Sequence, residues 1–250
     1  MPFAWLVEHE QELVPLLASQ PEPTPFQSLP WLTSWWQAYG QDYDAHILTV
    51  QCNGELVGVV PLMSAKDQAM PVLEWLGAGR SDHAPLLLQP DFADACLEAA
   101  LSYLYAAPFK WCLLSLRTLQ ESQCKWLRDR LPSGRYLLDR DDISPRTVVQ
   151  GNWDEYLARK SRKHRGNIKR LLKQAQELPA LQITCVGEFT AGLLDEIMEV
   201  ERRSWKAQEG SLRLEGEGRD FYQAFLQQFA AKRQLELWTC RYNETLLAYI

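Results

Sequence analysis

Hydrophobic residues recur at helical intervals in the first segments of the chain. Leu13, Leu16 and Leu17 have the spacing of one helix face and predict a helix over residues 8–18. The apolar stretch 30–39 begins with a proline and is followed by a glycine, which predicts a second helix with both ends marked. The chain therefore opens with two helices.

Alternation replaces helical spacing in the next segment. Residues 46–51 and 55–63 flank Asn53-Gly54, a dipeptide that favours the tight turn of a β-hairpin. Further elements are predicted beyond this hairpin: short strands at 72–76 and 85–88, a helix at 91–105, a strand at 111–117, a helix at 122–131 and one or two strands within 136–149.

The second half of the chain repeats the mixture of helices and strands. The predicted elements are a long helix at 153–177, a strand at 181–186, a helix at 190–206, a loop at 210–218, a helix at 219–233 and a strand pair at 235–242 and 245–250. Such alternation implies mixed sheets flanked by helices, an α/β (α+β) fold.

An internal similarity relates the two halves. A shift of 190 positions places the last strand pair on the first hairpin without a gap. Three aligned pairs are identical and a fourth is small in both copies: Thr49 and Thr239, Asn53 and Asn243, Leu56 and Leu246, Gly58 and Ala248. We therefore expect tandem domains at 1–149 and 150–250, the second truncated because it lacks a counterpart of residues 61–149.

Composition narrows the class of protein. The net charge of −6 gives no general attraction to nucleic acid or anionic membranes, and no apolar run approaches the ~20 residues needed to span a bilayer. The six cysteines form no CxxC pair and do not cluster with the four histidines, so no metal site is expected. The N-terminus turns acidic too early for a signal peptide, which predicts a cytoplasmic location.

One segment is strongly basic. Eight Lys or Arg residues lie between Arg159 and Lys173. Such a face could bind the phosphates of coenzyme A, an anionic sugar precursor, tRNA or anionic lipid, and Lys163, Arg165 and Arg170 are the candidate contacts. It could equally be a solvated helix face, because apolar residues supply a docking stripe on the same segment: Leu157, Ile168, Leu171, Leu172 and Ala175.

Two motifs resemble a known family. The stretch from Glu201 through Ser204-Trp205-Lys206 to Gly210-Ser211 and Phe221-Tyr222 has the pattern ExxSWKxxxGS, and the N-terminal stretch reads PFQSLPWLTSWWQAYG. Together with Ser81-Asp82, these resemble GNAT-type acyltransferases related to cellulose-biosynthesis proteins (CelD/BcsL-like). Those proteins have tandem GNAT-like folds and also resemble the FemABX aminoacyltransferases.

The resemblance implies acetyl-CoA or another acyl-CoA as co-substrate of the second domain. The family binds the pyrophosphate with a loop of the type (Q/R)xxGx(G/A), which we expect beyond residue 250, so the 250-residue chain is expected to be inactive. At the equivalent helix of the first domain, Pro90 removes a backbone N–H donor, and Asp91 and Asp94 would repel phosphate, so that domain is predicted to be non-catalytic.

The resemblance also assigns candidate site residues. Glu201 is the candidate general base, although the sequence is equally consistent with a surface carboxylate. Trp205 and Lys206 are placed in the acceptor or acyl cleft, or else are a core tryptophan and a helix-ending lysine. Ser81 and Asp82 are expected to line the cleft between the domains, or to form a simple capped turn.

The sequence thus favours transfer of an acyl group from acyl-CoA to an amine or hydroxyl of a small-molecule, saccharide or peptide-precursor acceptor. The context suggested by the resemblance is polysaccharide or cell-envelope synthesis. FemABX-like transfer from aminoacyl-tRNA and a non-catalytic GNAT-like binding module remain as alternatives.

Overall fold

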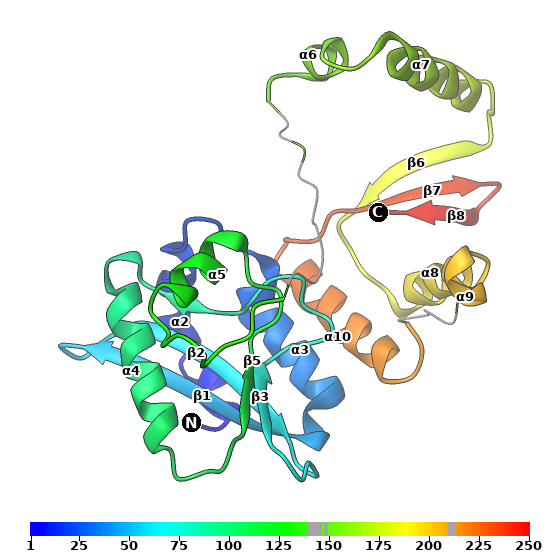
Figure 1. The fold of residues 1–250 in the computed structure, drawn as a ribbon. Helices are drawn as coiled ribbons and strands as arrows, with labels where there is room; N and C mark the ends of the chain where they lie inside the picture. The colour runs from blue at the N-terminus through cyan, green and yellow to red at the C-terminus, as the bar shows by residue number, and fades with distance from the viewer. Residues whose placement is uncertain (140–146, 148–149, 210–213) are drawn as a thin grey trace. The chain divides into compact units, whose positions relative to one another are not determined.

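The computed structural model describes residues 1–139, 147, 150–209 and 214–250. They form two compact units (Figure 1). The first comprises Met1–Asp139 with Leu214–Gln228, and the second lies within Arg140–Arg213 and Phe229–Ile250. The sequence-based division gives residues 150–250 to the second domain, whereas the structure packs Leu214–Gln228 within the first unit.

The first unit contains a mixed sheet with helices on both faces. Its strands are β1 (Tyr43–Cys52), β2 (Glu55–Ala65), β3 (Val72–Trp75), β4 (Leu87–Leu88) and β5 (Leu113–Ser115). The sheet order is β1-β2-β3-β5, with β4 also paired to β2, and only β3 and β5 run parallel. The helices are α1 (Ala4–Glu8), α2 (Glu10–Ala18), α3 (Leu29–Tyr39), α4 (Ala93–Ala106), α5 (Glu121–Arg128) and most of α10 (Glu217–Ala231). Three short 3-10 turns complete it: Pro25–Gln27, Gly40–Asp42 and Pro90–Phe92.

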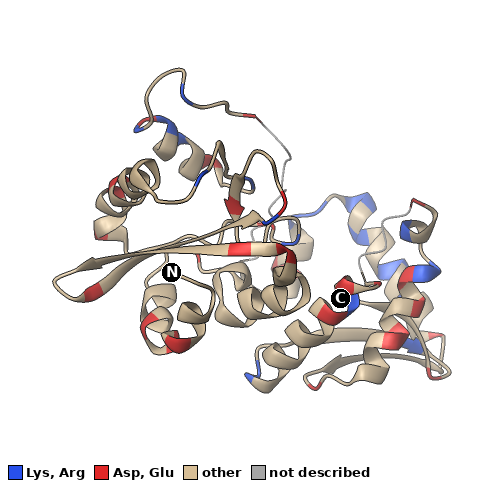
Figure 2. Ribbon diagram, turned by 90° about the horizontal axis from the view of Figure 1, so that it is seen from below, with Lys and Arg blue, Asp and Glu red and all other residues tan. Residues whose placement is uncertain are grey.

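Alternation along β2 divides the core into two layers. Val59 and Met63 pack with α1, α2 and α3, whereas Val60 and Leu62 pack on the face covered by α4. The strands of the β1–β2 hairpin carry charged residues only near their ends (Figure 2). Two-sided burial explains why β2 is almost continuously apolar.

Helix α3 forms where the sequence predicts it. Its N-cap is Ser28, whose Oγ accepts the N–H of Trp31, and Pro30 lies in the first turn. The helix buries Trp31 and Trp35 in the core. The predicted helix 122–131 is shorter in the structure, and the closing strands predicted within 136–149 lie mostly outside the described residues.

Helix α10 completes the first core. Phe221 is fully buried, and its ring lies edge-on to that of Trp31 with the ring centroids 5.0 Å apart. Gln228 Nε2 donates to Ser34 Oγ at 2.9 Å. A segment more than 70 residues beyond the rest of the first unit is therefore part of its core.

The second unit has a three-stranded antiparallel sheet in the order β6-β7-β8. Its strands are β6 (Leu181–Val186), β7 (Leu237–Tyr242) and β8 (Thr245–Tyr249), and its helices are α6 (Trp153–Ala158), α7 (Arg162–Gln176), α8 (Ala191–Arg202) and α9 (Trp205–Gln208). Helix α8 packs on β8.

Two helices predicted as continuous are broken in the structure. The predicted helix 153–177 ends at Ala158 and restarts at Arg162, because Ser161 Oγ accepts the N–H of His164 and caps a new helix. The predicted helix 190–206 breaks in the same way at Ser204, whose Oγ accepts the N–H of Lys206. A serine N-cap stops each helix despite an uninterrupted helical pattern.

The two hairpins have the same register. Val50 pairs with Gly58 and Cys240 with Ala248, each 190 positions apart, and the register shifts after Val50 in one hairpin and after Cys240 in the other. Asn53 and Asn243 both have positive φ at the turn. A bulge at equivalent positions does not follow from amphipathic composition. The two hairpins thus agree in their pairing and in the position of the bulge at the 190-residue shift.

We predict that Phe221→Ala lowers the free energy of unfolding by about 3–5 kcal/mol, because it empties a fully enclosed site in the first core. Chemical denaturation measures the loss. The matched control on the same helix, Gln227→Ala, is exposed and should change stability by less than about 0.5 kcal/mol. Equal effects from both variants would contradict the placement of α10.

A pH effect follows from His46. Its Nε2 lies 2.9 Å from Ser64 Oγ and its ring stacks on Phe109. Burial lowers the pKa of His46, with a smaller lowering from the N-terminal ammonium and an opposing rise from Asp44. Below the ordinary value of about 6.5 the unfolded chain therefore binds more protons than the folded one.

Stability should accordingly fall as the pH drops below about 6.5 towards the folded-state pKa of His46. His46→Gln should flatten this part of the profile, measured by denaturation at a series of pH values. An unchanged slope in the variant would exclude His46 as the cause.

Candidate functional site

Helix α8 carries a carboxylate into its buried face. Leu194, Ile197 and Met198 are buried along one stripe, and Glu201 continues that stripe four residues after Ile197. The side chain of Glu201 is only 7% exposed. The interpretation of Glu201 as a surface carboxylate is therefore wrong.

At the break between α8 and α9 the chain turns, so that the side chain of Lys206 on α9 reaches the Glu201 carboxylate. Ser204 Oγ donates to the Glu201 carbonyl at 2.7 Å while it caps α9. The turn brings Lys206 Nζ to 2.5 Å from Glu201 Oε1. Ser204 thus positions the lysine that neutralises the buried charge.

Tyr249, on β8, supplies a second donor to the same oxygen. Its hydroxyl lies 2.5 Å from Glu201 Oε1. No described residue donates to Glu201 Oε2. We call Glu201, Lys206 and Tyr249 the carboxylate cluster; it presents one anchored carboxylate oxygen and a second oxygen able to accept a proton or hydrogen bond.

Trp205 lies beside this cluster but is 62% exposed. The alternative that it is a core residue is wrong. An exposed indole ring offers a flat apolar surface to a ligand, and its N–H is a potential donor.

Ser81 and Asp82 belong to the first unit. Ser81 is buried, and its Oγ accepts the indole N–H of Trp31 at 2.9 Å. A Cβ on Gly77 would lie 2.7 Å from this oxygen, so the packing around it is close. Asp82 is exposed. Ser81 thus has a structural contact within the core, and a cleft-lining role for either residue stays a prediction.

The three basic candidates lie on α7 with different contacts. Arg165 donates to the carbonyls of Ala158 and Lys160, at 3.2 and 2.6 Å, and so stabilises the break between α6 and α7. Arg170 contacts Asn167 and Gln174 on its own helix. Lys163 and Arg170 line a shallow hollow on the surface of α7. Ligand binding by these residues remains a prediction.

One stretch matches the pattern (Q/R)xxGx(G/A) of a phosphate-binding loop. Residues 213–218 read RLEGEG, and the last two of them begin α10. Their surroundings do not suit pyrophosphate, because Glu215, Glu217 and Asp220 gather at the helix start and would repel it. The stretch also follows α9 rather than a strand. We therefore do not assign coenzyme A phosphates to it.

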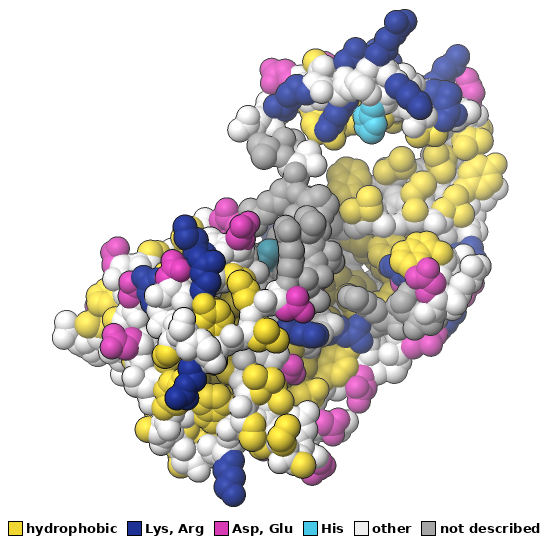
Figure 3. Space-filling model, viewed as in Figure 1, with side chains coloured by type: hydrophobic (Ala, Val, Ile, Leu, Met, Phe, Trp, Pro, Cys, Tyr) yellow, Lys and Arg dark blue, Asp and Glu magenta, His cyan; other side chains and the backbone are white. Residues whose placement is uncertain are grey.

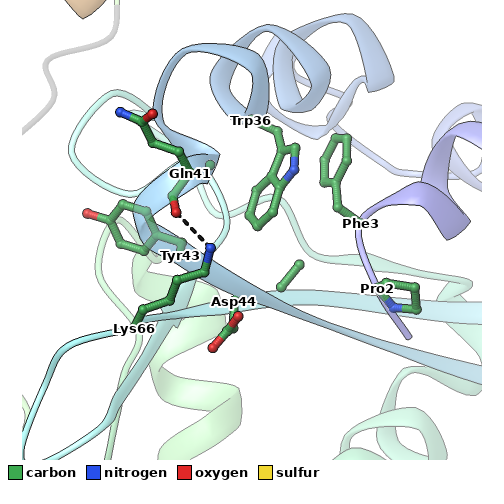
Figure 4. A pocket seen from close by; sticks show the side chains of 9 residues that line it. Pro2, Phe3, Trp36, Gln41, Tyr43, Asp44 and Lys66 are labelled. Atoms are coloured by element: carbon green, nitrogen blue, oxygen red, sulfur yellow. Dashed lines mark hydrogen bonds between the residues drawn. The ribbon is translucent and has the colours of Figure 1, made fainter.

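A hollow in the first unit lies between the N-terminus, α3 and β1 (Figure 4). The rings of Phe3 and Trp36 stack there with centroids 4.8 Å apart, and Lys66 Nζ donates to the Gln41 carbonyl at 2.7 Å. Asp44 at its edge is exposed. The hollow has no buried acid or base and offers no group with which to activate an acceptor.

Two further observations concern the described part of the chain. It contains no group of three or more His, Cys, Asp or Glu residues placed to hold a metal ion. Within the same residues, every helix is too short or too polar to cross a membrane.

Sequence reasoning found Glu201, Lys206 and Trp205 but missed Tyr249. The hydroxyl and the carboxylate are 48 residues apart, and their contact depends on the packing of α8 against β8. The only available signal was the alignment of β8 with β2, which identifies the strand but not the partner of its last residue.

Comparisons with known proteins agree with this architecture. Residues 162–250 match the model of the acetyltransferase (GNAT) domain Acetyltransf_6. No curated protein matches the chain. The crystal structure of FemX is similar with a TM-score of 0.58 and 17% identity, over 93% of this chain and 56% of FemX. A conserved protein of unknown function from Bacteroides thetaiotaomicron VPI-5482 gives 0.50 and 14%, over 98% and 72%.

The two structural similarities establish the fold alone, and this chain spans just over half the length of FemX. The domain match contains the carboxylate cluster and all of α7, whereas Ser81 and Asp82 lie outside it. The segment from residue 162 to 250 is therefore similar to a GNAT-type acetyltransferase domain, and the chain has a GNAT-like mixed α/β fold.

Proposed function

We propose that this chain contributes the acceptor side of an acyltransferase that moves an acyl group from acyl-CoA to an amine or hydroxyl. The observation that carries the proposal is the buried Glu201, anchored through Oε1 by Lys206 and Tyr249 within the matched acetyltransferase domain. Both donors leave Oε2 for a further partner.

Glu201 would act as the general base. When an acceptor nitrogen or oxygen attacks an acyl carbon, it must lose a proton, and a positioned carboxylate can take that proton directly or through one water. Lys206 and Tyr249 hold the carboxylate in a single orientation, which reduces the loss of freedom on reaching a reactive geometry.

Trp205 is the proposed apolar wall for the acceptor. Its exposed ring is on the residue directly before Lys206. A saccharide or peptide precursor offers apolar ring or side-chain faces that can lie against an indole. Such an acceptor in polysaccharide or cell-envelope synthesis is part of the proposal.

The proposal that acyl-CoA is the acyl donor depends on the domain match, because the described residues form no evident binding site for its phosphates. Acyl-CoA would supply an activated acyl carbon, but the RLEGEG stretch is electrostatically unsuited to its phosphates. We therefore derive no step for the donor.

The shared register of the two hairpins supports a duplicated GNAT-like unit. In that proposal the first unit is non-catalytic. Its equivalent of Tyr249 is Val59, which is fully buried and has no hydroxyl. The first hairpin thus offers no counterpart of the donor from β8.

Transfer from aminoacyl-tRNA is the second candidate, and the observation that favours it is the basic face of α7. A GNAT-like binding module without turnover is the third.

The complete gene product, mixed with acetyl-CoA and a panel of amine and hydroxyl acceptors, should release free thiol in an acceptor-dependent manner. Turnover that requires aminoacyl-tRNA instead would favour the second candidate. Saturable acceptor binding without either turnover would favour the third.

Glu201→Gln should lower kcat by about 10²–10⁴-fold, because an amide cannot take the acceptor proton. Glu199→Gln is the matched control on the exposed face of α8 and should keep the kcat of the parent enzyme.

A purely structural role for Glu201 would give a different pattern. The Glu201→Gln variant would then melt at a lower temperature but retain kcat in the fraction that is folded, and the proposal of a general base would be wrong.

A further inference from the structure

Helix α7 separates basic and apolar residues onto opposite sides. At 100° per residue, Arg162, Lys169 and Lys173 fall within about 40° of one another. On the same wheel, Ile168 and Leu171 lie about 100–180° from these three cations, and Leu172 lies between the two groups. The sequence has no acid between Tyr156 and Glu177. Figure 3 shows Lys and Arg side chains gathered over this segment, with hydrophobic side chains along its edge.

The apolar side of this helix is open to a substantial degree. Leu171 and Leu172 are 49% and 50% exposed, and α7 has no buried residue. Leu178, just after the helix, is 44% exposed, and Trp153 at the start of α6 is 54% exposed. We call residues 153–178 the basic amphipathic segment.

Some cations of the basic amphipathic segment form no ion pair or hydrogen bond with the described residues. Arg162 and Lys169 have no partner among the described residues, whereas Arg165 is bound to two carbonyls. Lys173 has one distant contact, 3.9 Å from Glu177, with both side chains mostly exposed. Such a surface pair adds little, so Lys173 can exchange it for another anion.

We propose that the basic amphipathic segment docks on the surface of an anionic lipid bilayer. Basic residues on one side of a helix and leucines with an exposed tryptophan on the other are the combination that binds in the plane of a membrane interface. The leucines would enter the boundary between headgroups and acyl chains, and the cations would lie among the anionic headgroups.

The apolar residues favour lipid over nucleic acid as the occupant. Phosphate backbones are bound by cations and need no leucine, and single-stranded bases require aromatic side chains interleaved with the charges. The basic run from Arg159 to Lys173 contains no aromatic residue except His164.

Charge also sets the orientation of docking. The whole chain has a net charge of −6 although this segment is strongly basic. An anionic surface therefore attracts the segment and repels much of the remainder, and the attraction must weaken as salt rises. This proposal goes beyond acyl transfer and does not depend on it, because vesicle binding requires neither donor nor acceptor.

The test is co-sedimentation of the full chain with phosphatidylcholine vesicles that contain phosphatidylglycerol, and with vesicles of phosphatidylcholine alone. We expect binding to the anionic vesicles that falls with added salt, and little binding to the neutral ones. The triple variant R162Q/K169Q/K173Q should bind the anionic vesicles on the order of 100-fold more weakly, at roughly fivefold per cation.

A matched variant removes the same charge elsewhere. K110Q/K125Q/R135Q changes three exposed cations of the first unit and should leave vesicle binding within about twofold of the parent chain, since those residues lie outside the segment. L171Q/L172Q keeps good helix formers but should also weaken binding, while its salt dependence stays that of the parent. Circular dichroism checks that every variant remains folded.

Three outcomes would overturn the proposal. These are equal binding to neutral and anionic vesicles, an unchanged affinity in the folded R162Q/K169Q/K173Q variant, and salt-sensitive binding to tRNA without binding to vesicles. The last outcome would assign the basic face to nucleic acid.

Discussion

The second unit depends on how one buried negative charge is compensated. Removing a carboxylate from water costs several kcal/mol unless donors replace the lost hydration. Glu201 obtains those donors from two directions: Lys206 after the chain reverses at Ser204, and Tyr249 from the end of β8. Helix α8, helix α9 and the last strand must therefore take their observed places together for the charge to be tolerated.

The same constraint connects structure to chemistry. A carboxylate held through one oxygen has a defined direction for the other, which is what proton transfer to a positioned base requires. An apolar residue at position 201 would satisfy the buried stripe of α8 at lower cost. This cost is the reason why we propose a reactive rather than a stabilising role for Glu201.

Much of the fold could be predicted from local signals. The hairpin at Asn53-Gly54, helix α3 and the equivalence of the two hairpins follow from turn chemistry, capping and alternation. The breaks at Ser161 and Ser204 were missed, because a serine within a helical pattern either caps a new helix or points to solvent, and only the packing around it decides. Helix α10 shows the same limit: its apolar stripe predicts burial but does not identify the core that receives Phe221.

The sequence identified Glu201, Trp205 and Lys206 as site residues but not the contacts that they make. The four-residue spacing between Ile197 and Glu201 predicts that the carboxylate lies on the buried face of α8. The contact with Tyr249 cannot be predicted in this way, because it depends on packing between distant segments. A double-mutant cycle on Glu201→Gln and Tyr249→Phe, followed by chemical denaturation, measures that contact directly. The account predicts a coupling free energy of about 1–3 kcal/mol, as expected for a hydrogen bond to a buried charged group. Additive effects of the two substitutions, with no coupling, would contradict it.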